Sequence, residues 1–159
     1  MARAIESDAR LKNYRVNVVT FSVVREAAAP APAKLNGPAE VAALAREVIP
    51  DDGREHFYAL YLNAQNGLIA VHAVSVGTVS ATLVHAREVF GPALRLLGVS
   101  SVVLIHNHPS GEATPSREDI RLTRQLVEAA RLLDLRVHDH VVIGNGTGSF
   151  VSLAEQGVI

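Results

Sequence analysis

Two repeating patterns of apolar residues divide the chain into strands and helices. Runs rich in β-branched and aromatic residues predict strands at residues 14–25, 57–62, 68–76, 99–105, 135–143 and 150–151. Apolar residues spaced three and four positions apart predict amphipathic helices at residues 38–48, 80–97 and 116–133. We expect the third helix to bury Ile120, Thr123, Val127 and Ala130, with Leu126 and Leu133 as further candidates. Strands that alternate with helices predict an α/β domain, in which a mixed β-sheet of roughly five or six strands is flanked by helices.

Turn-forming residues mark the boundaries between these elements. Asn66-Gly67 predicts a hairpin turn between the strands at 57–62 and 68–76. A stretch rich in proline and alanine follows the first predicted strand, and such a composition is typical of a linker. The sequence therefore predicts an N-terminal strand and linker over residues 1–37 and one globular domain over residues 38–159.

Composition and charge narrow the classes of function. The chain of 159 residues is 48% hydrophobic, which is enough for the core of one domain, and its net charge of −1 gives no electrostatic case for nucleic acid or an anionic membrane. It has no cysteine, so a metal site must use histidine and carboxylate ligands. Because neither a signal peptide nor a transmembrane run is recognisable, we expect a cytoplasmic protein without membrane contacts.

One segment combines a strand end with side chains that bind metals. His106 and His108 follow the apolar strand, and because side chains alternate along a strand, both imidazoles lie on one face, about 6–7 Å apart along the chain. A turn with two prolines then leads to a helix that carries Asp119 in its first turn. Two imidazoles and one carboxylate, with a fourth position open to water, form the ligand set of a catalytic zinc. The spacing therefore predicts a zinc site.

Two other interpretations explain the same residues without a metal. A histidine at a strand end is often solvated or hydrogen-bonded. Ser116 and Asp119 also fit the S-x-x-[DE] pattern of a capping box at the start of a helix. The combination of two histidines on one face and a returning carboxylate favours the metal site over these alternatives.

Hydrolysis of an amide by zinc-activated water also needs a group that accepts the water proton and passes it to the leaving nitrogen. Glu55 is a candidate because it lies just before the strand at 57–62. Glu112 and Glu118 are closer in sequence to the ligands, but they lie in a turn and on an exposed helical face. The residues alone do not decide among these three carboxylates.

Several motifs resemble those of a known family. His106-x-His108-Pro109, followed by Ser116 and Asp119, resembles the metal signature of the JAB/MPN (JAMM) metallopeptidases. The fuller pattern H-N-H-P-S-G-x-x-x-P-S-x-x-D resembles that of the RadC branch of this superfamily. Further matches, which extend the resemblance over about residues 38–157, are Glu55 with F-Y-A-L-Y-L-N, V-S-V-G-T at 74–78, R-E-V-F at 87–90 and D-H-V-V-I at 139–143.

The resemblance implies a single JAB/MPN-like domain and a role for each matched residue. His106, His108 and Asp119 would bind Zn²⁺, and Glu55 would be the general acid/base that hydrogen-bonds the metal water. Ser116 would help to hold the oxyanion of the tetrahedral intermediate. All these positions carry the family residue, which implies a zinc metallopeptidase acting on a protein or peptide substrate.

Two departures from the family pattern bear on the partners. RadC proteins often carry an N-terminal helix-hairpin-helix region, and nothing before residue 38 resembles one, so DNA binding by that route is unsupported. Relatives that cleave ubiquitin grip it with insertions for which this chain has no room. The alternatives to a hydrolase are a nucleic-acid-associated protein of repair or mobile DNA and a non-catalytic interaction module. The sequence gives no oligomeric state.

Two groups of residues outside the signature have more than one interpretation. A strand would place His138 and His140 on one face, which allows a second metal site, but hydrogen bonds that fix the sheet or the surroundings of the site are the favoured interpretation. One side of the helix at 116–133 carries arginines, which we interpret as a solvated face rather than as phosphate contacts; they are Arg117, Arg121, Arg124 and Arg131.

Overall fold

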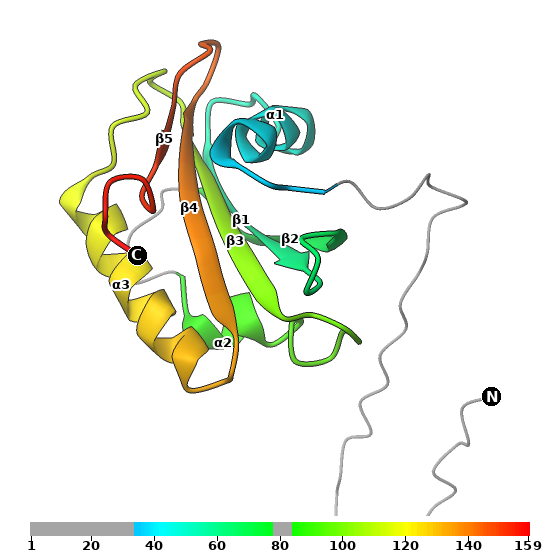
Figure 1. The fold of residues 1–159 in the computed structure, drawn as a ribbon. Helices are drawn as coiled ribbons and strands as arrows, with labels where there is room; N and C mark the ends of the chain where they lie inside the picture. The colour runs from blue at the N-terminus through cyan, green and yellow to red at the C-terminus, as the bar shows by residue number, and fades with distance from the viewer. Residues whose placement is uncertain (1–33, 78–83) are drawn as a thin grey trace, which may run out of the picture. The chain divides into compact units, whose positions relative to one another are not determined.

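A mixed β-sheet of five strands forms the centre of the computed structural model, which describes residues 34–77 and 84–159 (Figure 1). The strands are β1 (Glu55–Leu62), β2 (Leu68–Gly77), β3 (Ser101–His108), β4 (Arg136–Gly144) and β5 (Phe150–Ser152), in the order β2-β1-β3-β4-β5. β3 and β4 are parallel, and the other neighbouring pairs are antiparallel. This confirms the predicted α/β class with a mixed sheet. The strand predicted at 14–25 lies outside the described residues.

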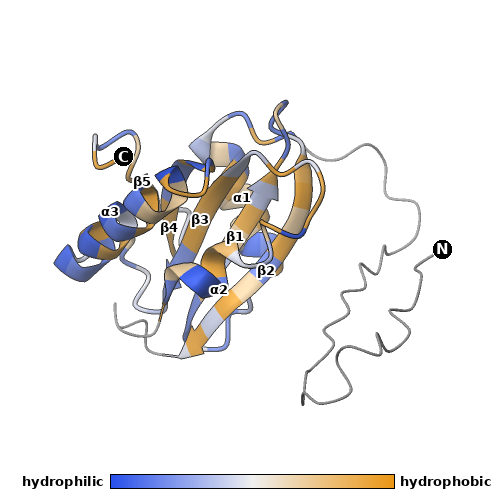
Figure 2. Ribbon diagram, turned by 90° about the horizontal axis from the view of Figure 1, so that it is seen from below, coloured by the Kyte–Doolittle hydropathy of each residue, from blue (hydrophilic) through white to orange (hydrophobic). Residues whose placement is uncertain are grey.

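Helices cover both faces of the sheet. α1 (Pro38–Val48) packs on one face, whereas α2 (Ala86–Phe90) and α3 (Arg117–Arg131) pack on the other, so that the core consists of two apolar clusters (Figure 1). Figure 2 shows that apolar positions concentrate in the strands, whereas α3 carries many polar ones. Within residues 34–77 and 84–159, no helix has the length and apolar character needed to cross a membrane.

β1 has side chains in both clusters because its neighbours β2 and β3 leave it in the interior of the sheet. Phe57 and Tyr61 pack under α2 and α3, and Leu60 packs under α1; all three are fully buried. The continuous apolar run at 57–62 is therefore that of a central strand, as predicted. The predicted hairpin between β1 and β2 is also present, and Asn66 adopts a φ of 59° in its turn.

The buried side of α3 differs from the one predicted. Thr123, Leu126 and Ala130 are buried as expected, but Asp119 and Leu122 complete the buried set. Ile120 and Val127, which were expected in it, are half-buried. Asp119 faces the sheet, and the helical period of 3.6 residues then places Leu122, Thr123 and Leu126 on the same side. The position of the carboxylate therefore sets the rotation of the helix.

α2 is much shorter than the helix predicted at 80–97. It begins after His85 and ends at Phe90, and Gly91-Pro92 follows. Proline has no N–H for a helical hydrogen bond and its ring clashes with the preceding turn, so the apolar spacing beyond it does not continue the helix. Residues 80–83 of the prediction lie outside the described residues.

Candidate metal centre

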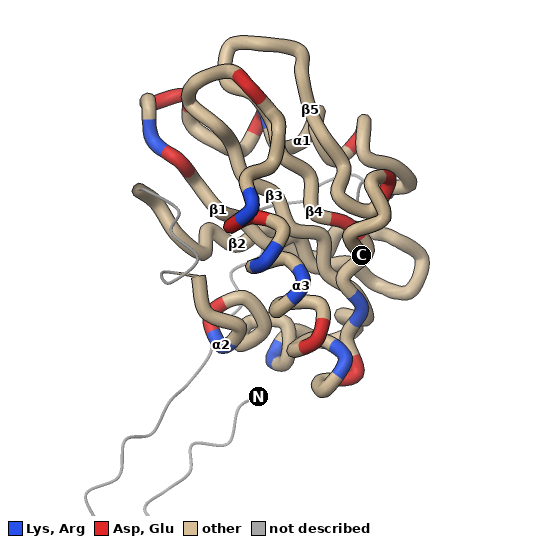
Figure 3. The backbone as a smooth tube through the Cα atoms, turned by 90° about the vertical axis from the view of Figure 1, so that its left-hand side faces the viewer, with Lys and Arg blue, Asp and Glu red and all other residues tan. Residues whose placement is uncertain are grey.

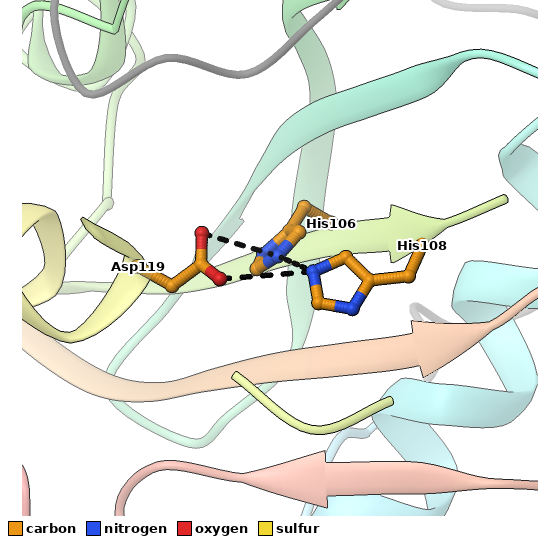
Figure 4. Close-up of side chains that lie close together, drawn as sticks. All are labelled: His106, His108 and Asp119. Atoms are coloured by element: carbon orange, nitrogen blue, oxygen red, sulfur yellow. Dashed lines mark hydrogen bonds and ion pairs between the residues drawn. The ribbon is translucent and has the colours of Figure 1, made fainter. Parts of the chain in front are cut away.

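Three side chains from β3 and α3 converge where the strand ends and the helix begins. One ligand atom from each of His106, His108 and Asp119 lies within 4.8 Å of the other two. The two Nε2 atoms are 3.0 Å apart, and the carboxylate oxygens lie 3.5 Å from His106 Nε2 and 3.6 Å from His108 Nε2 (Figure 4). The structure thus brings together the three residues predicted as ligands, and two imidazoles with one carboxylate suit Zn²⁺ with an open position.

Alternation along β3 places both histidines on the face that α3 covers. His106 pairs with Phe57 of β1, and its side chain is 1% exposed. The His108 side chain, two residues further on, is 16% exposed. The group is therefore closed on the side of the core and partly exposed to solvent at His108.

A backbone carbonyl orients the His108 ring. Nδ1 of His108 lies 2.7 Å from the carbonyl oxygen of Glu112, which can only accept, so Nδ1 carries the proton and donates it. Nε2 then faces Asp119. The hydrogen bond with Asp119 raises the pKa of His108 above its ordinary value, and burial opposes this effect.

Asp119 is both a member of the ligand group and the third helical residue of the capping box that Ser116 opens at the start of α3. Its Oδ2 accepts hydrogen bonds from the backbone N–H and the hydroxyl of Ser116, each at 2.7 Å, and its own N–H donates to Ser116 Oγ at 3.1 Å. Burial acts to raise the pKa of Asp119, but the hydrogen bonds with His106 and His108 prevail and lower it far below its usual range. The capping box and the ligand group are therefore compatible, because the cap holds the carboxylate towards the histidines.

Ser116 is exposed at the start of α3, and its hydroxyl donates to Asp119. Glu55 is the first residue of β1 and, two positions before Phe57, lies on the sheet face that carries the histidines. The hydrogen bond with Asp119 is the main cause of the raised pKa of His108, and the negative charge of Glu55 adds a small contribution in the same direction. Glu55 is therefore within electrostatic reach of the group.

The two alternative carboxylates have other surroundings. The side chain of Glu112 accepts hydrogen bonds from the N–H and the hydroxyl of Thr114, at 3.1 and 2.7 Å. Glu118 is exposed in the first turn of α3. These contacts favour Glu55 among the three candidates for the proton-transferring residue.

Asn107, between the two histidines, holds the backbone on either side of Glu55. Its side chain is fully buried, accepts a hydrogen bond from His56 N–H at 2.7 Å and donates one to the Arg54 carbonyl at 2.9 Å. A third bond, at 3.0 Å, joins it to Asn145 Oδ1. The β1–β3 ladder ends at Phe57, so this amide continues it by one step. Asn107 was not predicted from the sequence, although the side-chain amide of a buried strand residue needs hydrogen-bond partners.

His140 lies beside the ligand group, whereas His138 does not. Nε2 of His140 is 2.8 Å from Nδ1 of His106, and burial lowers the pKa of His140 well below its usual value. His138 lines a cavity of about 250 Å³ on the α1 side of the sheet. The pairing register of β4 shifts by one residue beside Val102, and this breaks the alternation expected to place the two histidines on one face. A shared second metal site is therefore ruled out by the geometry, and hydrogen bonding is the role that His140 has.

The loop that holds His108 rests against the loop after β4. The carbonyl of Gly111, the residue before Glu112, accepts hydrogen bonds from Thr147 Oγ1 at 3.2 Å and Ser149 Oγ at 3.1 Å. Gly144 packs against the Gly111 carbonyl. A Cβ at position 144 would overlap this carbonyl and lie 2.6 Å from Ser149 Oγ. No larger residue fits at position 144 without moving this loop.

Gly144→Ala is therefore expected to lower zinc affinity about 10-fold, the lower end of the range for residues that orient a ligand, because displacing Gly111 moves the carbonyl that orients His108. Competition with a chromophoric chelator measures the affinity. Gly148→Ala is the matched control, since a Cβ there meets no heavy atom within 4 Å. Equal affinities of the two variants would contradict the argument.

Comparison with known proteins agrees with the motifs and the geometry. The family model described as RadC-like JAB domain matches residues 35–158. The chain is 44% identical over 123 residues to a UPF0758 protein of Caldanaerobacter subterraneus, an alignment that covers 77% of this chain and 52% of the relative. It is 37% identical over 158 residues to a UPF0758 protein of Desulfitobacterium hafniense, with 99% of this chain and 65% of the relative covered. The chain thus spans between half and two thirds of these curated relatives.

Proposed function

The chain belongs to the RadC-like JAB domain family, and from this premise we propose that it is a zinc-dependent hydrolase of the peptidase or isopeptidase type. The observation that carries the proposal is the convergence of His106, His108 and Asp119 within 4.8 Å, with Glu55 on the same face of the sheet. An imidazole pair and a carboxylate leave room at a zinc ion for water and a substrate oxygen, which distinguishes hydrolytic from structural zinc sites.

Each residue of the group has a task in this proposal. His106 and His108 hold the ion through Nε2, and Asp119 supplies the third ligand, held in place by its bonds with Ser116. The bound ion would lower the pKa of a coordinated water towards about 7 and polarise the scissile carbonyl. Glu55 takes the proton from the attacking water and gives it to the leaving nitrogen.

Ser116 is proposed as the donor to the oxyanion. Its hydroxyl donates to Asp119 Oδ2, while the N–H of Ser116 bonds to the same carboxylate oxygen. The hydroxyl can therefore turn to the substrate without leaving this oxygen unbonded. An oxyanion-hole donor of this kind contributes about 10²- to 10³-fold to the rate.

The charge distribution of α3 does not favour a nucleic-acid partner. Its exposed charged residues are of both signs (Figure 3), namely Arg117, Glu118, Arg121, Arg124, Glu128 and Arg131. Arg131 donates to Glu128 at 2.7 Å, and Glu118 lies beside Arg117. A surface of mixed sign gives little of the phosphate attraction on which such binding depends. A protein or peptide substrate is therefore the partner that we propose.

The proposal is tested by loading the protein with zinc and screening peptide and lysine-linked isopeptide substrates, with His108→Ala as the control that removes one ligand. We expect one zinc per chain and cleavage of an amide in at least one substrate class, both lost in the variant. Stoichiometric zinc without any amide cleavage would instead support a non-catalytic interaction module. If the wild type takes up no zinc, the metal site itself is refuted.

A further inference from the structure

Three short contacts connect the helix that carries Asp119 to the ring of His106. The hydroxyl of Thr123 donates to the Asp119 carbonyl at 2.6 Å. The hydroxyl oxygen of Thr123 also lies 2.6 Å from Nδ1 of His140. Nε2 of His140 in turn lies 2.8 Å from Nδ1 of His106. Thr123 and His140 are both 0% exposed. The relay Thr123–His140–His106 therefore joins α3, β4 and β3 inside the core.

The proton positions along this relay follow from the donors and acceptors. A hydroxyl has one proton, and that of Thr123 goes to the Asp119 carbonyl; otherwise two oxygens would lie 2.6 Å apart with no proton between them. The Thr123 oxygen can then only accept at its contact with His140, so the proton of His140 is on Nδ1. Nε2 of His140 is left to accept, and His106 donates to it from Nδ1.

We infer that Thr123 and His140 are positioning residues that fix the tautomer of His106 in which Nε2 presents its lone pair to the ligand group. This rests on the proposed metal site but not on hydrolysis. A metal-bound histidine commonly donates its other N–H to a fixed acceptor, which sets its tautomer and ring orientation. Here the acceptor is itself a neutral imidazole, whose own tautomer is set by a helix hydroxyl.

The ring of Phe57 holds the two imidazoles in this arrangement. It stacks on His106 with centroids 6.0 Å apart and packs edge-on against His140 at 5.2 Å. The centroids of the two imidazoles are 4.8 Å apart. Rotation of either imidazole about its χ2 angle would therefore meet the ring of Phe57. The tautomers of His106 and His140 then change by proton transfer and not by rotation of the rings.

The test compares Thr123→Val with Thr123→Ser in the full chain. Valine keeps the shape of threonine but has no hydrogen-bond acceptor, so the tautomer of His140 with its proton on Nδ1 is no longer stabilised. Its Nε2–H tautomer would face the Nδ1–H of His106 and drive the His106 proton onto the atom that binds metal. We expect Thr123→Val to lower zinc affinity about 10- to 100-fold and Thr123→Ser to restore it to within about twofold.

His140→Phe and His138→Phe form a second, matched pair. Phenylalanine keeps the aromatic packing at position 140 but removes the acceptor for His106, so zinc affinity is expected to fall at least as far as in Thr123→Val. The same change at position 138, which does not contact His106, is expected to leave it within about twofold. Thermal unfolding of each zinc-free variant reports whether the fold is retained, and this pair remains decisive if Thr123→Val does not fold.

Nitrogen-15 NMR of the histidine rings gives a readout that a merely structural role would not move. In the metal-free protein, His140 is expected to carry its proton on Nδ1, and Thr123→Val to shift it to Nε2. A proton on Nε2 in the wild type, or equal zinc affinity of Thr123→Val and the wild type, would overturn the inference. Since affinity is measured without a substrate, a wild type that binds zinc but cleaves nothing leaves this inference intact.

Discussion

Replacing Glu55 by glutamine is expected to lower amide hydrolysis by the zinc-loaded protein about 10²- to 10⁴-fold while the zinc remains bound. Glutamine has nearly the same shape but cannot accept a proton from water, and general acid/base transfer contributes a rate factor of this size. None of the three proposed ligands is changed, and Asn107 still holds the backbone on both sides of the residue. The measurement pairs steady-state kinetics on the best substrate of the screen with zinc analysis of the same sample.

Glu112→Gln and Glu118→Gln are the matched controls for this prediction. Glu112 bonds to Thr114 and Glu118 is exposed, so neither change is expected to lower the rate more than about twofold. Activity that survives in Glu55→Gln but not in one of these variants would assign the proton transfer to another carboxylate. A loss of zinc in Glu55→Gln would show that the residue acts on metal binding instead.

Phe57→Ala is expected to lower the free energy of unfolding of the metal-free protein by about 3–5 kcal/mol, the range for a large buried aromatic side chain. Phe57 is fully buried under α2 and α3 and contacts the rings of both His106 and His140. Because the cavity frees both rings, zinc affinity is expected to fall as well. Urea denaturation of the zinc-free protein measures the first effect and chelator competition the second.

Leu60→Ala separates stability from positioning. Leu60 is also fully buried in β1 but packs in the cluster under α1, on the opposite face of the sheet. We expect a loss of about 2–5 kcal/mol in the free energy of unfolding with an unchanged zinc affinity of the folded protein. Equal losses of affinity in both variants would mean that Phe57 acts through global stability alone.

Much of the fold could be predicted because apolar periodicity is a local signal. The strand at 57–62 and the helix at 38–48 were confirmed because burial on two faces, or on one stripe, follows directly from residue spacing. The helix predicted at 80–97 was too long: α2 ends at Phe90, because Pro92 has no N–H to donate to the next helical hydrogen bond. On α3, hydrophobicity favoured Ile120 over Asp119, but the buried interactions of the carboxylate decide which side faces the sheet.

The candidate site shows where sequence information ends. The ligand group could be predicted because His106, His108 and Asp119 are close in the chain and their spacing resembles a known signature. Among the residues that hold them, Ser116 was recognisable from the capping-box pattern, but the hydrogen-bond partners of Asn107 and His140 were not. The His56–Asn107 bond joins residues 51 positions apart, and the His106–His140 contact joins residues 34 apart. Hydrogen bonds between distant strands have no periodicity, so only the fold reveals them.

The amide of Asn107 has a consequence for anyone who would build this centre into another protein. One tripeptide of β3 supplies two nitrogen ligands on one face and, on the other, the clamp for the neighbouring backbone that carries Glu55. The distance between the Glu55 carboxylate and the proposed metal site is thus set by two adjacent antiparallel strands, β1 and β3. A design that copies only the side chains of Glu55, His106, His108 and Asp119 would lack this spacing. Copying two short strand segments and one turn of helix would retain it.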